Sequence, residues 1–279
     1  MKTPQLSAKL EGTTAVVEIY DDIGPSWAGM IDTKAVAESL ANVGEFEAIE
    51  VRINSLGGSA HEGIGIFNLF RAYTASTPVS VRIDGIAASS ASLVAMAGQT
   101  VSMGVGALLM VHEPWCICLG DAAEMRKTAD MLDTIIDSGV SIYQSKCGKD
   151  GDEIRSWMAE ETWFTGDEAV EVGLVDQLEG TADVAANLSD RWSFKNAPKA
   201  FSEMIAMSVK KQATFSVSKE GNMTNQTNEH KPEVLATDAV TEPAAAATES
   251  GATDGDPRAT FTAELNRFCD KFGAENGAK

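Results

Sequence analysis

Three hydroxyl side chains stand in a run of very small residues, between a strand-like stretch and an apolar one. The run GIAASSAS spans residues 85–92, and its serines are Ser89, Ser90 and Ser92. Serines in such a run often hydrogen-bond only to the backbone, while the small residues allow close helix packing. A serine at the turn from a strand into a helix, however, exposes its hydroxyl and can act as a nucleophile beside a base.

Histidine is the usual base for such a serine, and the chain has three histidines. His112 closes the apolar run LLMVHEP, His61 follows a glycine turn, and His230 lies in a low-complexity region. In α/β folds with parallel strands, ligand crevices form beyond the carboxyl ends of the strands. His112 is therefore the candidate base, although a histidine at such a position is equally often a half-buried structural residue.

A glycine turn supplies the third kind of group that acyl transfer requires. In INSLGGSAHEG a strand-like segment ends near Ile53, and Gly57 and Gly58 precede a helix-like segment. Paired glycines leave backbone N–H groups uncovered, and such groups can bind an oxyanion. The turn lacks the lysine of a P-loop and the spacing of a dinucleotide-binding loop. Serine, histidine and N–H donors together indicate nucleophilic acyl transfer.

The elements that must position these groups alternate from the start of the chain to about residue 180. β-branched runs predict strands, and apolar residues three and four apart predict helices. Strand, helix and strand in succession are typical of parallel sheets with right-handed crossovers. The sequence thus predicts an α/β fold with strands at residues 14–20, 48–53, 78–86 and 107–114, helices at residues 33–43, 61–73, 121–148 and 151–161, and a short helix capped by Thr165 and Glu168.

Two features of the helical segments bear on packing. The serine-rich run is expected to open a further helix after Ser89. The segment over residues 121–148 carries one apolar stripe and is predicted to form a long amphipathic helix. The stripe consists of Met125, Leu132, Ile136, Val140 and Tyr143.

Composition excludes several classes of function. The net charge is −19, and such an acidic balance repels nucleic-acid phosphates. The cysteines have no CxxC spacing, so we expect reduced thiols and no metal site. No segment has the apolar run of a signal peptide or the length of a membrane span, which predicts a soluble, cytoplasmic protein. The cysteines are Cys116, Cys118, Cys147 and Cys269.

The C-terminal third differs in character from the rest. Residues 214–258 are rich in Ala, Thr, Glu, Asn, Gly and Pro, and this composition predicts a disordered tail. Residues 259–279 regain an apolar helical pattern and are expected to form a short helix. The predicted organisation is a catalytic domain at residues 1–190, a connecting segment at residues 191–213, the tail, and that helix.

Four motifs, in order, resemble the ClpP family of serine proteases. They are INSLGG, DGIAASSASLVAMAG, LLMVHEP and WFTGDEAVEVGLVD, and the resemblance covers roughly residues 14–180. The chain is most similar to the ClpP-related head-maturation, or prohead, proteases of tailed bacteriophages. This resemblance implies the ClpP/crotonase-like fold of repeated β-β-α units with a mostly parallel sheet.

The resemblance also implies roles for individual residues. Ser89 matches the family's nucleophile and His112 its base. The third member is an aspartate in the family, and the matching position here is Glu161, a carboxylate with one more methylene; Glu160 is the alternative.

The family's oxyanion donors match the N–H groups of Gly58 and Ser90, and Gly57 belongs to the same substrate-binding turn. By the same resemblance, an extended peptide would pair with the chain at residues 58–60 and with the chain after His112.

The implied function is a serine endopeptidase that processes capsid and scaffold proteins during head maturation. The resemblance implies protein substrates, a homo-oligomer assembled through the long helix, and no cofactor, metal, nucleic acid or membrane partner. The expected location is the host cytoplasm or the interior of the prohead.

Other functions remain open from the sequence. A catalytically degenerate member of the family would serve as a capsid-assembly scaffold component, which the Ala/Glu-rich tail favours. Crotonase-type acyl-CoA enzymes share the superfold but rely on carboxylates and bind a nucleotide with basic residues. Membrane-associated signal-peptide peptidases pair serine with lysine, and no lysine stands near the serine run.

Overall fold

The computed structural model describes residues 4–180, 194–198 and 201. A hairpin opens the chain, strands and helices then alternate, and short elements close the described part. In order these elements are β1 (Leu6–Glu11), β2 (Thr14–Ile19), the 3₁₀ turn η1 (Ser26–Ala28), α1 (Thr33–Ala41), β3 (Ala48–Ser55), α2 (Ala60–Tyr73), β4 (Val79–Ala88), α3 (Ser90–Ala95), β5 (Thr100–Gly104), β6 (Leu108–Val111), α4 (Ala122–Cys147), α5 (Gly151–Glu160), β7 (Thr162–Phe164), α6 (Gly166–Glu171) and β8 (Gln177–Glu179).

One sheet of mostly parallel strands organises these elements, which confirms the predicted fold class. Its order is β1-β2-β3-β4-β5-β8, with β6 paired to the end of β4 and β7 paired to β6. The pairs β2–β3, β3–β4, β4–β5, β4–β6 and β5–β8 are parallel. β1–β2 and β6–β7 are antiparallel. Because only two residues join β1 to β2, that pair must form a hairpin.

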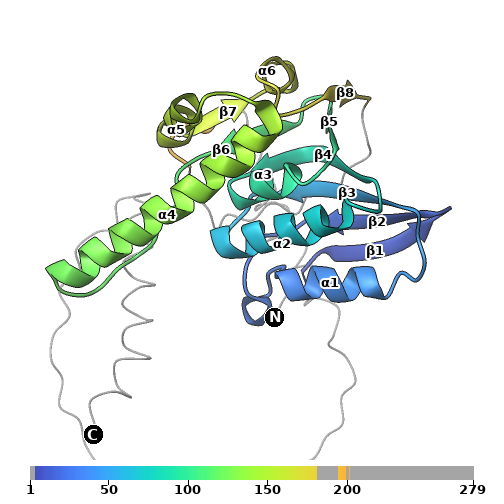
Figure 1. Cartoon of the computed structure of the whole chain (residues 1–279), viewed down its shortest axis with the longest axis horizontal. Coiled ribbons are helices and arrows are strands. Elements are labelled where there is room, and N and C mark those ends of the chain that lie inside the picture. Colours follow the sequence, from blue (N-terminus) through green and yellow to red (C-terminus); the bar gives the residue numbers. More distant parts are fainter. Residues whose placement is uncertain (1–3, 181–193, 199–200, 202–279) are drawn as a thin grey trace, which may run out of the picture. The chain divides into compact units, whose positions relative to one another are not determined.

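Alternation along the strands sends one set of side chains into the main core. In β3, Ile49, Val51 and Ile53 are buried, while Glu50 and Arg52 between them are partly exposed. Helices α1, α2 and α3 pack on the same face of the sheet (Figure 1). Each fully buried aliphatic or aromatic side chain contributes about 1.5–3 kcal/mol. The helical side chains in this core include Val36, Leu40, Ile66 and Phe70.

Local sequence fixes where the helices begin. The Asp32 carboxylate accepts the Ala35 N–H at 2.7 Å, and the Asp121 carboxylate accepts the Glu124 N–H at 3.0 Å. These N-caps satisfy backbone donors that a helix leaves unpaired in its first turn. The structure reproduces the boundaries predicted from the sequence to within two residues for α1, α2, α4 and α5.

Only the C-terminal half of α4 is buried in the domain. Its buried residues begin at Gly139 and end at Tyr143, whereas Met125 is 53% and Met131 44% exposed. The predicted helix is confirmed, but its apolar stripe is buried only in the second half, because the first half extends away from the sheet (Figure 1). None of the described helices has both the length and the apolar character needed to cross a bilayer.

Four strands were absent from the sequence prediction. β1 is an exposed edge strand, while β7 and β8 have three residues each, too few for a periodic signal. β5 is separated from the end of α3 by four residues and has only five residues itself, too few for a clear alternation. The strand predicted at residues 107–114 ends at Val111, and the predictions for residues 214–279 lie outside the described residues.

Candidate active site

Ser89 occupies a strained turn between β4 and α3. Its φ of 56° is positive, which is unfavourable for any residue except glycine. Hydrogen bonds hold this conformation on both sides of the residue. The Ser89 N–H donates to the Met110 carbonyl at 3.0 Å, and the Ser89 carbonyl accepts from the Ser92 N–H at 3.0 Å. The surrounding structure therefore imposes the strain and fixes the hydroxyl at the mouth of a cavity.

Strand pairing brings His112 to Ser89. In the parallel pair β4–β6, Ala88 lies opposite Met110, so the residues after these strands emerge side by side. His112 Nε2 lies 2.7 Å from Ser89 Oγ. This distance is within the range for direct proton transfer between a hydroxyl and an imidazole.

The surroundings of His112 favour its neutral form. Burial lowers the pKa of the imidazole below its usual value, because the charged form loses hydration. The negative charge of Glu161 opposes this change by raising the pKa, and the positive charge of Lys195 lowers the pKa further. At neutral pH the imidazole is therefore free to accept a proton.

A second strand pairing carries Glu161 toward His112. In the antiparallel pair β6–β7, Val111 lies opposite Thr162, so one further step places His112 across from Glu161. Glu161 ends α5 in a left-handed conformation with a φ of 53°, and its side chain is buried. Glu160, the alternative considered from the sequence, is exposed and accepts a hydrogen bond from Ser156 at 3.3 Å.

The Glu161 carboxylate accepts hydrogen bonds from groups other than His112. The N–H of Lys195 donates to Oε2 at 2.9 Å, the N–H of Asn196 to Oε1 at 2.7 Å, and the indole of Trp163 to Oε1 at 3.3 Å. Within the described part of the chain, no hydrogen bond joins this carboxylate to the imidazole. Glu161 therefore acts on His112 through its charge in this structure.

The glycine turn approaches the serine closely. A Cβ added to Gly57, whose φ is +86°, would lie 2.8 Å from both Ser89 Cβ and Ser90 N and would also collide with the Ala88 carbonyl. Only glycine permits this approach. Among the described residues, no acceptor receives the N–H of Gly58 or of Ser90, and both residues line the cavity.

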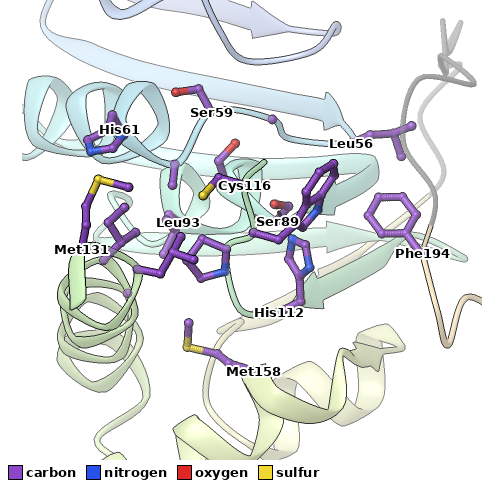
Figure 2. Close-up of a pocket in the computed structure, with 18 of the residues that line it drawn as sticks. Leu56, Ser59, His61, Ser89, Leu93, His112, Cys116, Met131, Met158 and Phe194 are labelled. Atoms are coloured by element: carbon purple, nitrogen blue, oxygen red, sulfur yellow. Dashed lines mark hydrogen bonds between the residues drawn. The ribbon is translucent and has the colours of Figure 1, made fainter. Parts of the chain in front are cut away.

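A cavity of about 440 Å³ opens beside the Ser89 hydroxyl. Figure 2 shows Ser89 and His112 pointing toward each other, with Leu93 and Met131 on one side of them and Phe194 on the other. Most of the lining is apolar, and it contains neither lysine nor arginine among the described residues. It includes Leu93, Trp115, Ile117, Met131, Leu132, Ile135, Gly139 and Met158.

The other serines of the run have different environments. Ser92 is buried and its Oγ lies 2.7 Å from the Tyr143 hydroxyl. Ser90 is also buried, and its hydroxyl has no hydrogen-bond partner in the structure. His61 is exposed at the start of α2, and Cys116, Cys118 and Cys147 are free thiols. His112 is thus the histidine that the fold places against Ser89.

Two contributors to the site were missed from the sequence. Trp163 belongs to β7, which is too short to recognise. Residues 194–198 were assigned to a connecting segment, although they contact both Glu161 and His112. A signal was available for them, because the stretch RWSFKNAPKAF places three aromatic residues in an otherwise polar region.

Comparison with protein families identifies one match. The model of the family described as Clp protease matches residues 31–181, which is just over half of the 279 residues. The matched span contains the glycine turn, Ser89, His112 and Glu161.

Individual relatives are similar over the same region. The chain is 28% identical over 153 residues to the ATP-dependent Clp protease proteolytic subunit 1 of Salinibacter ruber, covering 53% of this chain and 65% of the relative. It is also 28% identical over 132 residues to the ATP-dependent Clp protease proteolytic subunit of Bacteroides fragilis, covering 47% and 63%. The chain thus spans less than two thirds of the length of these relatives.

Proposed function

The chain belongs to the Clp protease family, and we propose that it is a serine endopeptidase with Ser89 as its nucleophile. The observation that carries this proposal is the 2.7 Å contact between Ser89 Oγ and His112 Nε2. A hydroxyl held in a strained turn, beside an imidazole kept neutral by burial, is the arrangement that nucleophilic acyl transfer requires.

The reaction begins when Ser89 Oγ attacks a peptide carbonyl and its proton passes to His112 Nε2. The charge of Glu161 stabilises the imidazolium that forms, because it raises the pKa of His112. His112 then protonates the leaving amine. In the second half of the reaction, His112 takes a proton from the water that attacks the acyl-enzyme and returns it to Ser89 Oγ as the acid product leaves. A base in this position contributes on the order of 100- to 10,000-fold to the rate.

The developing oxyanion needs hydrogen-bond donors close to the nucleophile. In the part of the chain that the structure describes, no acceptor receives the N–H of Gly58 or of Ser90, and both residues line the cavity, so we assign them this role. Gly57 allows the turn to approach Ser89 and Ser90 closely, since any side chain there would collide with both residues. Removal of one such donor typically lowers kcat by about 100- to 1,000-fold.

The cavity favours a peptide over an acyl-CoA thioester as the substrate. A nucleotide carries phosphates that basic residues recognise, and the described cavity lining contains no lysine or arginine. An apolar side chain of a peptide, on the acyl side of the scissile bond, would fill the cavity beside Ser89, whose lining includes Leu93, Met131 and Ile135. His112, rather than a lysine, contacts Ser89, which distinguishes the site from a serine–lysine peptidase.

Reaction with a fluorophosphonate probe, followed by mapping of the labelled residue, tests the proposal. Wild-type protein should be labelled at Ser89, and the His112→Ala variant should lose the label. Ser89→Ala should abolish cleavage of protein and peptide substrates. A folded wild-type sample that takes no label would refute the assignment and favour a non-catalytic role in assembly.

We further propose that the substrates are capsid and scaffold proteins of a tailed bacteriophage, and that the protein acts as a homo-oligomer. The support is the resemblance of the four sequence motifs to prohead proteases and the low-complexity composition of residues 214–258. On incubation, wild-type protein should shorten its own C-terminal region, and Ser89→Ala should stay intact. Equal stability of both forms would favour the scaffold alternative.

A further inference from the structure

A short C-terminal stretch of the described chain packs against the candidate active site. We name residues 194–198 together with Phe201 the C-terminal strap. The strap lies outside the region that the family model matches, which ends at residue 181. Its contacts are therefore a feature of this chain beyond the shared domain.

The strap binds both oxygens of the Glu161 carboxylate. The Lys195 N–H reaches Oε2 and the Asn196 N–H reaches Oε1, at 2.9 and 2.7 Å. The Asn196 side chain adds a third bond by donating from Nδ2 to the Glu160 carbonyl at 2.6 Å. Two donors, one on each oxygen, fix the direction in which the Glu161 carboxylate points.

Apolar packing fixes the strap on the sheet. Phe194 and Phe201 join a small core with Ile86, Ala88 and Met110. In β4, Ile86 and Ala88 alternate with Ala87, which faces the main core. The small core therefore lies on the opposite face of the sheet. The Phe194 ring also meets Trp163 at a centroid distance of 5.4 Å in an edge-to-face arrangement.

The strap reaches the base as well as the acid. The rings of Phe194 and His112 meet edge to face, with centroids 6.3 Å apart, and Phe194 lines the cavity (Figure 2). Phe194 thereby covers one side of the imidazole, while the neighbouring backbone holds Glu161. One short segment thus contacts two members of the proposed triad.

We propose that the C-terminal strap is a working part of the active site, in which Asn196 is a positioning residue that holds Glu161 where its charge acts on His112. This inference rests on the proposed peptidase function. Ser89 and His112 already lie at a productive distance with the strap in place, so the strap supports the site and does not block it. The position of the Glu161 carboxylate then depends on the strap, which follows the region that the family model matches.

The test uses the full-length chain with Asn196→Ala, which removes the side-chain anchor on the Glu160 carbonyl. A displacement of about 1 Å in a catalytic group lowers the rate by on the order of 100-fold. We expect kcat to fall about tenfold to 100-fold with KM changed less than about twofold. Asn68→Ala, an exposed position on α2, is the matched control and should keep wild-type kcat.

The pH profile separates positioning from a purely structural role. Glu161 and Lys195 are the charges that act on His112, the first raising and the second lowering its pKa. If Asn196→Ala releases the carboxylate, the pKa of His112 falls, and the acid limb of kcat/KM moves to lower pH. If Asn196→Ala only weakened the packing of the strap on the sheet, the melting temperature would fall and the acid limb would not move.

Conservative variants keep the test decisive if Asn196→Ala does not fold. Asn196→Gln retains an amide donor and should recover most of kcat, while Phe194→Leu retains apolar packing but loses the ring against His112. Wild-type kcat and an unmoved acid limb in Asn196→Ala, or in Phe194→Leu where Asn196→Ala does not fold, would overturn the proposal, as would an increase in activity, which would mark the strap as inhibitory. Absence of fluorophosphonate labelling at Ser89 in the wild type would instead refute the peptidase function itself.

Discussion

Replacing Gly57 by alanine should impair catalysis through a steric mechanism that the structure makes specific. The new Cβ would stand 2.8 Å from Ser89 Cβ and 2.8 Å from Ser90 N. Carbon atoms attract at about 3.5–4.0 Å, so the turn and the serine must separate by roughly 0.7 Å or more. The N–H groups of Gly58 and Ser90 would then no longer converge on one oxyanion.

The expected loss follows from this displacement. A shift approaching 1 Å at a reacting group lowers kcat by on the order of 100-fold, equivalent to about 2.7 kcal/mol of activation free energy. A left-handed conformation at a non-glycine residue costs a further amount of about 1–2 kcal/mol in the free energy of unfolding. Gly57→Ala should therefore be both less stable and much less active than wild type.

Gly106 provides the matched control for backbone strain. Its φ is +81°, close to the +86° of Gly57, but no atom lies within 4 Å of an added Cβ. Gly106→Ala should lose only the stability that the backbone strain costs, with unchanged kcat. The pre-steady-state burst of leaving group released as the acyl-enzyme forms, together with urea unfolding, measures both quantities. If Gly57→Ala retained wild-type kcat, or Gly106→Ala lost it equally, close approach of the turn would not be the basis of catalysis.

Further predictions concern the charges, the cavity and the buried hydroxyls. Glu161→Gln removes the charge that raises the pKa of His112, so the acid limb of kcat/KM should move to lower pH, whereas Lys195→Gln should move it to higher pH; shifts of one sign in both would contradict this assignment. A Cβ added at Gly139 would lie 3.2 Å from Met158 Cε and 3.8 Å from Leu93 Cδ2, so Gly139→Leu should push these side chains into the cavity. It should lower kcat/KM about tenfold for peptides with a large apolar residue at the cleaved bond, while peptides with alanine at that position should be cleaved as by the wild type. Tyr143→Phe removes the hydroxyl that pairs with Ser92 and should reduce the free energy of unfolding by about 1 kcal/mol, measured by urea titration; no change would show that the pair contributes nothing.

The parallel core and its helices could be predicted because their signals are local. β3 alternates buried Ile49, Val51 and Ile53 with charged residues, and Asp32 and Asp121 cap their helices through neighbours three residues away. Each of these preferences acts within one turn or one strand, so sequence periodicity reveals it. β1 also alternates, but it contains no β-branched residue and only Leu6 and Ala8 in it are partly buried, so it lacks the pattern of a core strand.

The sequence by itself determined the residue types of the candidate site: a serine at a strand-to-helix turn, a histidine after a strand, and paired glycines before a helix. Tertiary structure decided their distances, because Ser89, His112 and Glu161 meet only through the pairing of β4, β6 and β7. It also decided that Glu161 binds the backbone of Lys195 and Asn196 rather than the imidazole. A carboxylate accepts hydrogen bonds from whichever donors the fold brings within reach. Sequence periodicity does not show which donors those are.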